Sequence, residues 1–357
     1  MLLNLINYQT LVCSKASRIV EVAKPSSVVD FGLRRAPGPE AGIRAARAAY
    51  IAGAVGTSNV EAAKRFGIPV SGTMAHSFVM AHTNELNAFR AWCKAYPEGT
   101  TLLIDTYNVV QGARNACQVV REGAALKAVR IDSGDFADNT YRVRAILNDA
   151  GLEHVHIIVS GDMNEEKIRA LKRAPIDGFG VGTEMVTARP EAALSGVYKL
   201  VEVDGRPCIK LSSGKKTLPG RKQVWRCEAY DILGKADDVE RGRPLLENLM
   251  VNGKRLHSLP SLRDILSYCR NEIEKLPASI VDSGSEYTVR ISENLNVLQA
   301  SFDGLSHYPR VLTSRSGTGR DGGRAPNLDR RGALDGDASP PGGVAEAETN
   351  EAKLQGS

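Results

Sequence analysis

Short apolar runs recur along the chain up to residue 183, and each one ends in small or acidic residues and is followed by a helical pattern. Amphipathic stretches over residues 108–121, 138–150 and 164–173 separate the later runs. Asn164, followed by two glutamates, is typical of a helix start. Continuous apolar strands that alternate with helices predict a parallel sheet covered by helices. The predicted strands are Ser27–Gly32, Gly53–Ser58, Ile68–Thr73, Thr101–Thr106, Ala128–Gly134, Ile157–Gly161 and Gly178–Thr183.

So many strand–helix units favour a closed β/α barrel over an open doubly wound sheet. After residue 196 the pattern changes. Residues 197–212 predict a β-hairpin with an Asp-Gly turn at 204–205, residues 221–230 add a strand, and residues 261–276 predict a helix. We therefore expect a β/α barrel core over residues 1–196, and a small antiparallel β module with C-terminal helices packing on the barrel over residues 197–310.

The last part of the chain, residues 311–357, is rich in Gly, Pro, Arg, Asp and Ser and holds almost no large apolar residues. Such a segment buries too little surface to offset its ordering entropy, so we predict a disordered tail. Its arginines are compatible with a nucleic-acid arm. The aspartates among them and the acidic final stretch favour a solvated tail instead.

The whole chain has 357 residues and a formal net charge of +5, which is too weak to argue for a nucleic-acid partner. No run of about 18 apolar residues is present, so no membrane span is expected. The first residues lack a basic region and a cleavage site, and the six cysteines show no C-x-x-C spacing. These features favour a reduced, cytosolic compartment.

Candidate chemistry gathers where the predicted strands end, because the active site of a β/α barrel lies at the carboxyl ends of its strands. Two successive strands end in Ser-Gly-Asp, at residues 133–135 and 160–162. Glycine allows an anion to approach the backbone, and the following helix offers free N–H groups. This combination suggests phosphate binding with carboxylates for Mg²⁺. Each such turn taken alone favours the simpler interpretation of a β-to-α turn and helix cap, but several turns on one rim favour phosphate chemistry.

Two further residues on this rim allow more than one interpretation. Arg130 lies inside an apolar strand, where it could pair with a buried carboxylate or bind a substrate carboxylate in bidentate fashion. His76 opens a helix just after a strand end. It could act as acid, base or nucleophile, or simply cap and pack the helix.

Two glycine-containing segments do not carry the nucleotide motifs that they superficially suggest. Residues 213–217 end like a P-loop, but Ile209 stands where the first glycine belongs and the context is a hairpin. The glycines at 178, 180 and 182 lack the spacing and the downstream acidic residue of a dinucleotide fingerprint.

Six motifs follow one another along the chain: FGLRRAPGPE from Phe31, GTMAHS from Gly72, LIDTYN from Leu103, VRIDSGD from Val129, GFGVGT from Gly178 and SGVYKLV from Ser195. Taken together, and in this order, they resemble those of the nicotinate phosphoribosyltransferase family. The resemblance implies an irregular β/α barrel of the type II phosphoribosyltransferase kind, usually in a homodimer. It also implies the formation of nicotinate mononucleotide and diphosphate from nicotinate and 5-phosphoribosyl 1-diphosphate, coupled to ATP hydrolysis, in NAD salvage.

The resemblance also implies roles for individual residues. His76 matches the histidine that ATP phosphorylates, and Thr73 and Arg130 match residues that hold nicotinate, the arginine through the carboxylate. Thr183 matches a residue that binds phosphoribosyl diphosphate. Further candidates for ribose, Mg²⁺ or phosphate contacts are Asp132, Asp135, Ser160 and Gly182, with Mg²⁺ assigned to Asp132 and Asp135.

Alternatives remain at this point. Family members carry a substantial stretch upstream of the region matched here, so one alternative is a truncated, catalytically weak chain that acts as an interaction or regulatory partner of a full-length subunit. Another is a related barrel enzyme that acts on nicotinamide or quinolinate. An enzyme that acts on nicotinamide should differ from this sequence around residues 72–77. An enzyme that acts on quinolinate needs more basic residues, because quinolinate has a second carboxylate.

Overall fold

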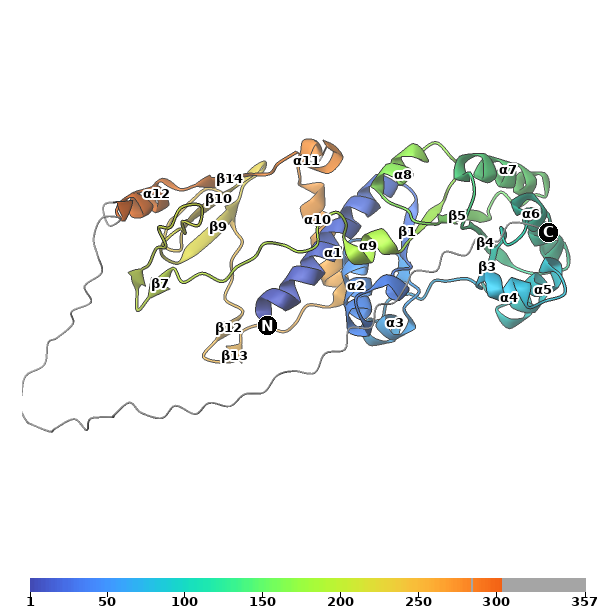
Figure 1. Cartoon of the computed structure of the whole chain (residues 1–357), viewed down its shortest axis with the longest axis horizontal. Helices are drawn as coiled ribbons and strands as arrows, with labels where there is room; N and C mark the ends of the chain where they lie inside the picture. Colours follow the sequence, from blue (N-terminus) through green and yellow to red (C-terminus); the bar gives the residue numbers. More distant parts are fainter. Residues whose placement is uncertain (284, 304–357) are drawn as a thin grey trace, which may run out of the picture. The chain divides into compact units, whose positions relative to one another are not determined.

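The computed structural model describes residues 1–283 and 285–303, and the predicted tail at 311–357 lies outside these residues. Its main sheet has six parallel strands in the order β2-β1-β6-β5-β4-β3 (Figure 1). The first strand pairs with the last, as in a closed barrel, and the sheet is open only between β2 and β3. It is therefore a half-barrel. The strands are β1 (Ser27–Asp30), β2 (Gly56–Thr57), β3 (Thr100–Leu103), β4 (Leu126–Ile131), β5 (His156–Ser160) and β6 (Gly178–Val181).

The predicted strand at residues 68–73 accounts for the opening. It forms a single parallel bridge between Thr57 and Val70 instead of a full strand. Pro69 has no N–H to donate, so only its carbonyl and the N–H of Ser71 pair with Thr57 before the chain leaves the sheet. The other six predicted strands form, with ends shifted by a few residues.

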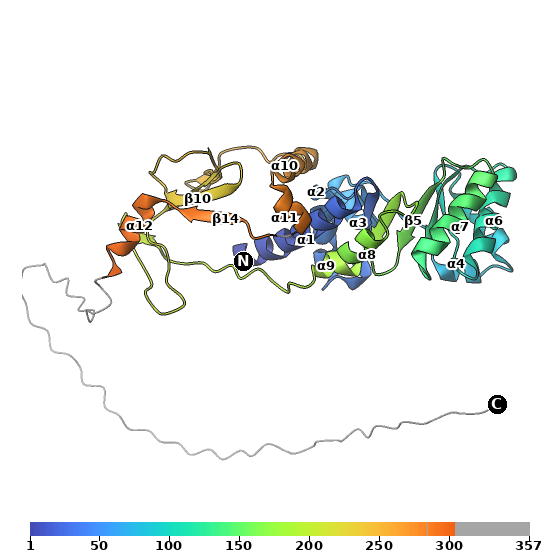
Figure 2. The same ribbon diagram turned by 90° about the horizontal axis from the view of Figure 1, so that it is seen from above.

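Helices follow the strands as the β/α pattern predicts, and α5, α6 and α7 pack beside β3, β4 and β5 (Figure 2). Asn108 and Asn164 cap α6 and α8 by accepting hydrogen bonds from backbone N–H groups, which explains where these helices begin. The helices are α1 (Leu2–Ala23), α2 (Pro39–Ile51), α3 (Val60–Phe66), α4 (His76–Met80), α5 (Glu85–Ala95), α6 (Val109–Arg121), α7 (Phe136–Asp149), α8 (Glu165–Ala170) and α9 (Thr183–Thr187), with a 3₁₀ turn at Leu33–Arg35.

The core has two main apolar clusters, one under each half of the sheet. The first surrounds β3, β4 and β5, with Phe89, Leu103 and Ile157 fully buried. The second joins α1 to β1 and β6, and Ile19 and Phe179 lie at its centre. Together they fix the strand ends against the covering helices. Within the described residues, no helix is long and apolar enough to cross a membrane.

The second sheet has the order β11-β9-β10-β14, and two short hairpins accompany it. The sequence predicts an antiparallel module, but β14 runs parallel to β10. The reason is its connection: α10 and α11 lie between these strands and return the chain to the same end of the sheet, as a parallel pair requires. The elements are β7 (Glu202–Val203), β8 (Arg206–Pro207), β9 (Lys222–Arg226), β10 (Tyr230–Lys235), β11 (Arg243–Pro244), β12 (Met250–Val251), β13 (Lys254–Arg255), α10 (Leu262–Glu274), α11 (Ala278–Ser283), β14 (Thr288–Ile291) and α12 (Glu293–Ala300).

Candidate active site

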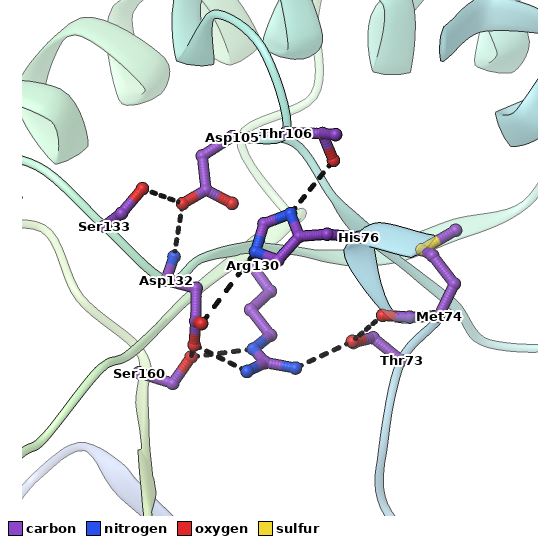
Figure 3. A network of polar contacts seen from close by, with 9 residues as sticks. All are labelled: Thr73, Met74, His76, Asp105, Thr106, Arg130, Asp132, Ser133 and Ser160. Carbon is purple, nitrogen blue, oxygen red and sulfur yellow. Dashed lines mark hydrogen bonds and ion pairs between the residues drawn. The ribbon is translucent and has the colours of Figure 1, made fainter. Parts of the chain in front are cut away.

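A cluster of polar side chains lies at the carboxyl ends of β4 and β5 (Figure 3). Arg130 is the penultimate residue of β4, and Ser160 is the last residue of β5. Asp132 directly follows β4, while Thr73 and His76 lie just after the bridge at Val70. Parallel strands bring their carboxyl ends to one edge, and this is why residues up to 87 positions apart meet here.

The guanidinium of Arg130 is held at three of its nitrogens. Its Nε donates to Ser160 Oγ at 2.7 Å, one terminal nitrogen donates to Thr73 Oγ1 at 3.0 Å, and the other donates to Asp132 Oδ1 at 2.6 Å. Only 18% of the side chain is exposed. An arginine carries five N–H donors, so one N–H on each terminal nitrogen remains available for a bidentate carboxylate.

An aromatic ring lies beneath this guanidinium. The Cζ of Arg130 is 4.9 Å from the centroid of Phe31, in cation–π geometry. A Cβ added at Gly180 would lie 2.4 Å from the Phe31 ring, so the ring needs a glycine at that position of β6. Close packing against the Phe31 ring therefore requires the glycine at position 180 of the GFGVGT motif. The sequence analysis assigned no role to Phe31.

Asp132 has one more hydrogen-bond donor besides Arg130. Ser160 donates to Oδ1 through a short hydrogen bond. Partial burial raises the pKa of Asp132, but the Arg130 charge and the hydrogen bonds from Ser160 and Arg130 outweigh this effect. With His76 also nearby, the pKa lies below its ordinary value. Asp132 is therefore held as a carboxylate.

His76 connects this cluster to the loop after β3. Its Nδ1 lies 3.1 Å from Thr106 Oγ1, and its Nε2 lies 3.9 Å from Asp132 Oδ2. The imidazole is 40% exposed. It therefore has one ring nitrogen positioned by a hydroxyl, and the other facing a carboxylate at the open rim.

Asp105 is a second carboxylate that positions the rim. Its Oδ2 accepts hydrogen bonds from the Asp132 N–H at 2.9 Å and from Ser133 Oγ at 2.6 Å. Its Oδ1 is buried and has no hydrogen-bond partner among the described residues. The sequence analysis assigned no role to Asp105 or to Thr106. The LIDTYN motif was the available signal for both.

A further buried carboxylate, Asp30, lies at the end of β1. It accepts hydrogen bonds from Thr57 Oγ1 at 2.7 Å and from the Gly32 N–H at 2.9 Å. Burial raises the pKa of Asp30, and the two hydrogen bonds only partly oppose this effect.

The remaining candidates occupy different places. Gly182 and Thr183 form the turn from β6 into α9, where a Cβ at Gly182 would lie 3.0 Å from the Phe31 carbonyl oxygen. Asp135 caps α7 by accepting a hydrogen bond from the Asp138 N–H at 3.1 Å. The structure thus gathers Thr73, His76, Arg130, Asp132 and Ser160 into one network, and it gives Asp135 a capping contact outside that network.

The acidic residues at the rim suit a magnesium ion that is bound mainly by substrate phosphates, and not one held by protein side chains alone. Within the described residues, no group of three or more His, Cys, Asp or Glu side chains could hold a metal. Mg²⁺ commonly takes one or two carboxylates together with substrate phosphates, and it needs no complete protein cage. The unpartnered Oδ1 of Asp105 and the neighbouring Asp132 suit that arrangement.

Comparisons with known proteins give one consistent family. The family model for nicotinate phosphoribosyltransferase (NAPRTase) matches residues 26–233, and the model for the nicotinate phosphoribosyltransferase C-terminal domain matches residues 234–299. Nicotinate phosphoribosyltransferase pncB2 of Mycobacterium tuberculosis is 43% identical over 82% of this chain and 66% of its own length. Nicotinate phosphoribosyltransferase of Bacillus subtilis is 44% identical over 63% of this chain and 48% of its own length.

A solved structure agrees with these matches. The crystal structure of human nicotinic acid phosphoribosyltransferase has a TM-score of 0.72 and 27% identity, over 84% of this chain and 75% of that one. The chain spans less than two thirds of the length of the curated relatives named above. The chain belongs to the nicotinate phosphoribosyltransferase family.

Proposed function

We propose that this chain catalyses the reaction named by its relatives, the formation of nicotinate mononucleotide and diphosphate from nicotinate and 5-phosphoribosyl 1-diphosphate, coupled to ATP hydrolysis in NAD salvage. Arg130 carries the proposal, because its guanidinium is fixed by three hydrogen bonds and still has two N–H groups to offer. Nicotinate presents a planar carboxylate that matches such a pair of donors. Nicotinamide lacks the negative charge, so this site discriminates against it.

In the reaction, the pyridine nitrogen attacks C1 of the ribose as the bond from C1 to the diphosphate oxygen breaks. The diphosphate leaves with the bonding electrons, and positive charge develops on the sugar. Arg130 holds nicotinate by its carboxylate, with Thr73 as a further nicotinate contact beside it, so that the ring nitrogen faces C1. Gly182 and Thr183 offer backbone N–H groups at the start of α9 to the phosphates, with Ser160 and Asp135 as further candidates.

Mg²⁺ belongs to this proposal as an ion bound mainly by the substrate's diphosphate. Asp132 and Asp105 are the carboxylates that fit it best, while Asp135 already caps α7. When bound, the ion neutralises charge on the departing diphosphate. Asp132, held ionised by Arg130, also stabilises the positive charge that develops on the sugar.

ATP enters the proposal as a co-substrate through His76. A ring nitrogen of His76 attacks the γ-phosphorus of ATP, forming a P–N bond as the bond to the bridging oxygen breaks and ADP leaves. The new phosphoryl group places negative charge beside Asp132 and Thr106, which the imidazole already contacts. That charge alters substrate affinity at the rim, and this change couples the two reactions. Water then attacks the phosphorus as the P–N bond breaks, which releases inorganic phosphate and restores His76.

The family resemblance also supports a homodimer, and the scattered cysteines support a cytosolic location. We propose both, with nicotinate, phosphoribosyl diphosphate and ATP as the partners and no nucleic acid or membrane. Nothing in the described residues favours the alternative of an inactive regulatory chain over this account.

The test is conversion of labelled nicotinate to its mononucleotide by the purified chain, with Mg²⁺ and phosphoribosyl diphosphate, with and without ATP. We expect turnover that ATP stimulates, and His76→Ala should abolish the stimulation. His154→Ala, which changes an exposed histidine elsewhere, is the matched control. Absence of turnover in the folded chain would contradict the proposed activity, and full ATP stimulation in His76→Ala would contradict the role of His76.

A further inference from the structure

A cavity lies in the C-terminal part of the chain and shares no residue with the rim around Arg130. It has a volume of about 710 Å³ and lies between β9, β10 and β11 on one side and the end of α10 on the other. Ligand pockets typically have volumes of about 300–1,000 Å³. Its wall carries four cationic side chains, and these are Arg226, Arg241, Arg243 and Lys275.

Three of these four cations converge on one acidic residue of α10. Glu272 contacts Arg243 at 2.5 Å and Arg226 at 3.3 Å through Oε2, and Lys275 at 3.1 Å through Oε1. One carboxylate is thus shared by three cations. Arg226 has a second partner, because Asp231 accepts from its Nε and a terminal nitrogen at 3.1 and 3.0 Å. Arg243 and Lys275 therefore share a single negative charge.

Arg241 adds a cation with its donors unused, since it makes no ion pair within residues 1–283 and 285–303. Its position is fixed by its backbone. The Cys227 thiol donates to the Arg241 carbonyl, and a Cβ at Gly242 would lie 2.5 Å from the Arg226 carbonyl oxygen. Gly242 also has φ +106°, a backbone conformation that other residues rarely adopt, so this turn requires glycine. The turn therefore holds Arg241 at the wall.

Glu228 is the other acidic residue of the wall, and it pairs with none of the four cations in the described structure. Tyr287 and Leu276 supply apolar surface, and the Tyr287 hydroxyl is tied to Asp231 Oδ1 at 3.1 Å. The cavity thus combines cationic N–H donors with a small apolar wall.

We propose that this cavity binds a small molecule carrying a phosphate or diphosphate group, with Arg241, Arg243 and Lys275 as its anion contacts. Guanidinium and ammonium groups are the usual protein donors to phosphate oxygens. The Arg226–Asp231–Glu272 network holds the wall in place and need not move when the anion enters. The site is independent of the proposed catalytic activity.

Cys227 allows a local test because it lines the same cavity. The rate of its alkylation by iodoacetamide is measured by peptide mass spectrometry in the full chain, with increasing inorganic diphosphate as the probe. We expect diphosphate to protect Cys227 and to leave Cys93, which lines a different pocket, unchanged. This readout separates the site from any diphosphate bound at the rim.

The double variant Arg241→Ala/Lys275→Ala removes two anion contacts. Glu272 loses Lys275 but keeps Arg226 and Arg243, and Arg226 keeps Asp231. Loss of charged hydrogen bonds should weaken protection about tenfold or more. Arg221→Ala, a change of an exposed arginine beside β9, is the matched control and should protect as the wild type does. Absence of protection in the wild type, or equal protection in the double variant, would overturn the proposal.

A second variant keeps the test decisive if the double variant does not fold. Glu228→Gln removes a negative charge from the wall, so it must lower the diphosphate concentration that gives half protection. An unchanged half-protection concentration in this variant would refute the anion site.

Discussion

Arg130 and Asp132, two residues apart at the end of β4, face the same side and form an ion pair of 2.6 Å. This pair links the group proposed to hold nicotinate to the carboxylate that faces His76. Because Ser160 contacts both partners, the three side chains form one rigid unit. A change in one of them should therefore affect both substrate binding and the protonation of Asp132.

The variant Arg130→Lys should lose most of its activity although it keeps the positive charge. A lysine ammonium cannot reach Ser160, Thr73 and Asp132 in the planar geometry of the guanidinium and also hold a carboxylate. We expect kcat/KM for nicotinate to fall by about 100-fold, which corresponds to about 2.7 kcal/mol. Steady-state kinetics measure this effect. Arg142→Lys, on the exposed face of α7, is the control and should behave as the wild type. Wild-type kinetics in Arg130→Lys would show that a charge alone suffices.

The variant Asp132→Asn should be less stable than the wild type at pH 7, by about 1 kcal/mol or more. The pKa of Asp132 lies below its ordinary value in the folded chain. Its ionised form therefore stabilises the fold above the unfolded pKa, and this contribution is lost as the pH falls through the folded pKa. Urea unfolding at several pH values measures the difference, which should shrink in acid. A difference that stays constant with pH would rule out this account.

The variant Asp30→Asn should show the opposite sign. Burial raises the pKa of Asp30, so its ionised form costs stability above the folded pKa and its protonated form does not. Asparagine can keep both contacts without a charge: its Oδ1 accepts from the Gly32 N–H, and its Nδ2 donates to Thr57 Oγ1, which reverses the direction of that hydrogen bond. We expect higher stability than the wild type at pH 7, with the gain falling as the pH is lowered. A loss of stability at pH 7 would show that the hydrogen bonds to the carboxylate outweigh the cost of its burial.

The variant Gly112→Ala should disturb the rim from a distance. A Cβ at Gly112 on α6 would lie 2.0 Å from the Ile104 carbonyl oxygen, directly before Asp105. The backbone must shift, and we expect destabilisation of at least about 2 kcal/mol. Thermal unfolding measures it, and Gly72→Ala, where a Cβ meets open space, is the control. Equal stability of both variants would contradict the close contact of Gly112 on α6 with the Ile104 backbone just after β3.

Much of the half-barrel could be predicted from the sequence, because apolar runs and helix caps are local signals. Asn164, for example, caps α8 as its position indicates. The sequence could not show that residues 68–73 form only one bridge and no full strand. That outcome depends on the hydrogen bond from the Thr57 N–H to the Pro69 carbonyl across the sheet. The parallel pairing of β14 likewise depends on a distant return of the chain.

In the candidate site, too, local motifs could be predicted from the sequence and long-range contacts could not. The motifs identify Arg130 and His76 as candidates. Their positions near the carboxyl ends of predicted parallel strands place them on one rim. The contact of Arg130 with Phe31 could not be predicted, because it needs the absent side chain of Gly180, on a strand far along the sequence. The hydrogen bonds from Asp132 and Ser133 to Asp105 depend on the register of neighbouring loops, which periodicity does not report.

The central claim is that the fixed guanidinium of Arg130 holds the carboxylate of nicotinate. Calorimetric titration of the purified chain with nicotinate and with nicotinamide tests it without depending on turnover. We predict that nicotinate binds at least about tenfold more tightly, and that Arg130→Ala abolishes this preference while Arg142→Ala keeps it. Equal affinity for the two ligands, or a preference that survives in Arg130→Ala, would contradict the claim.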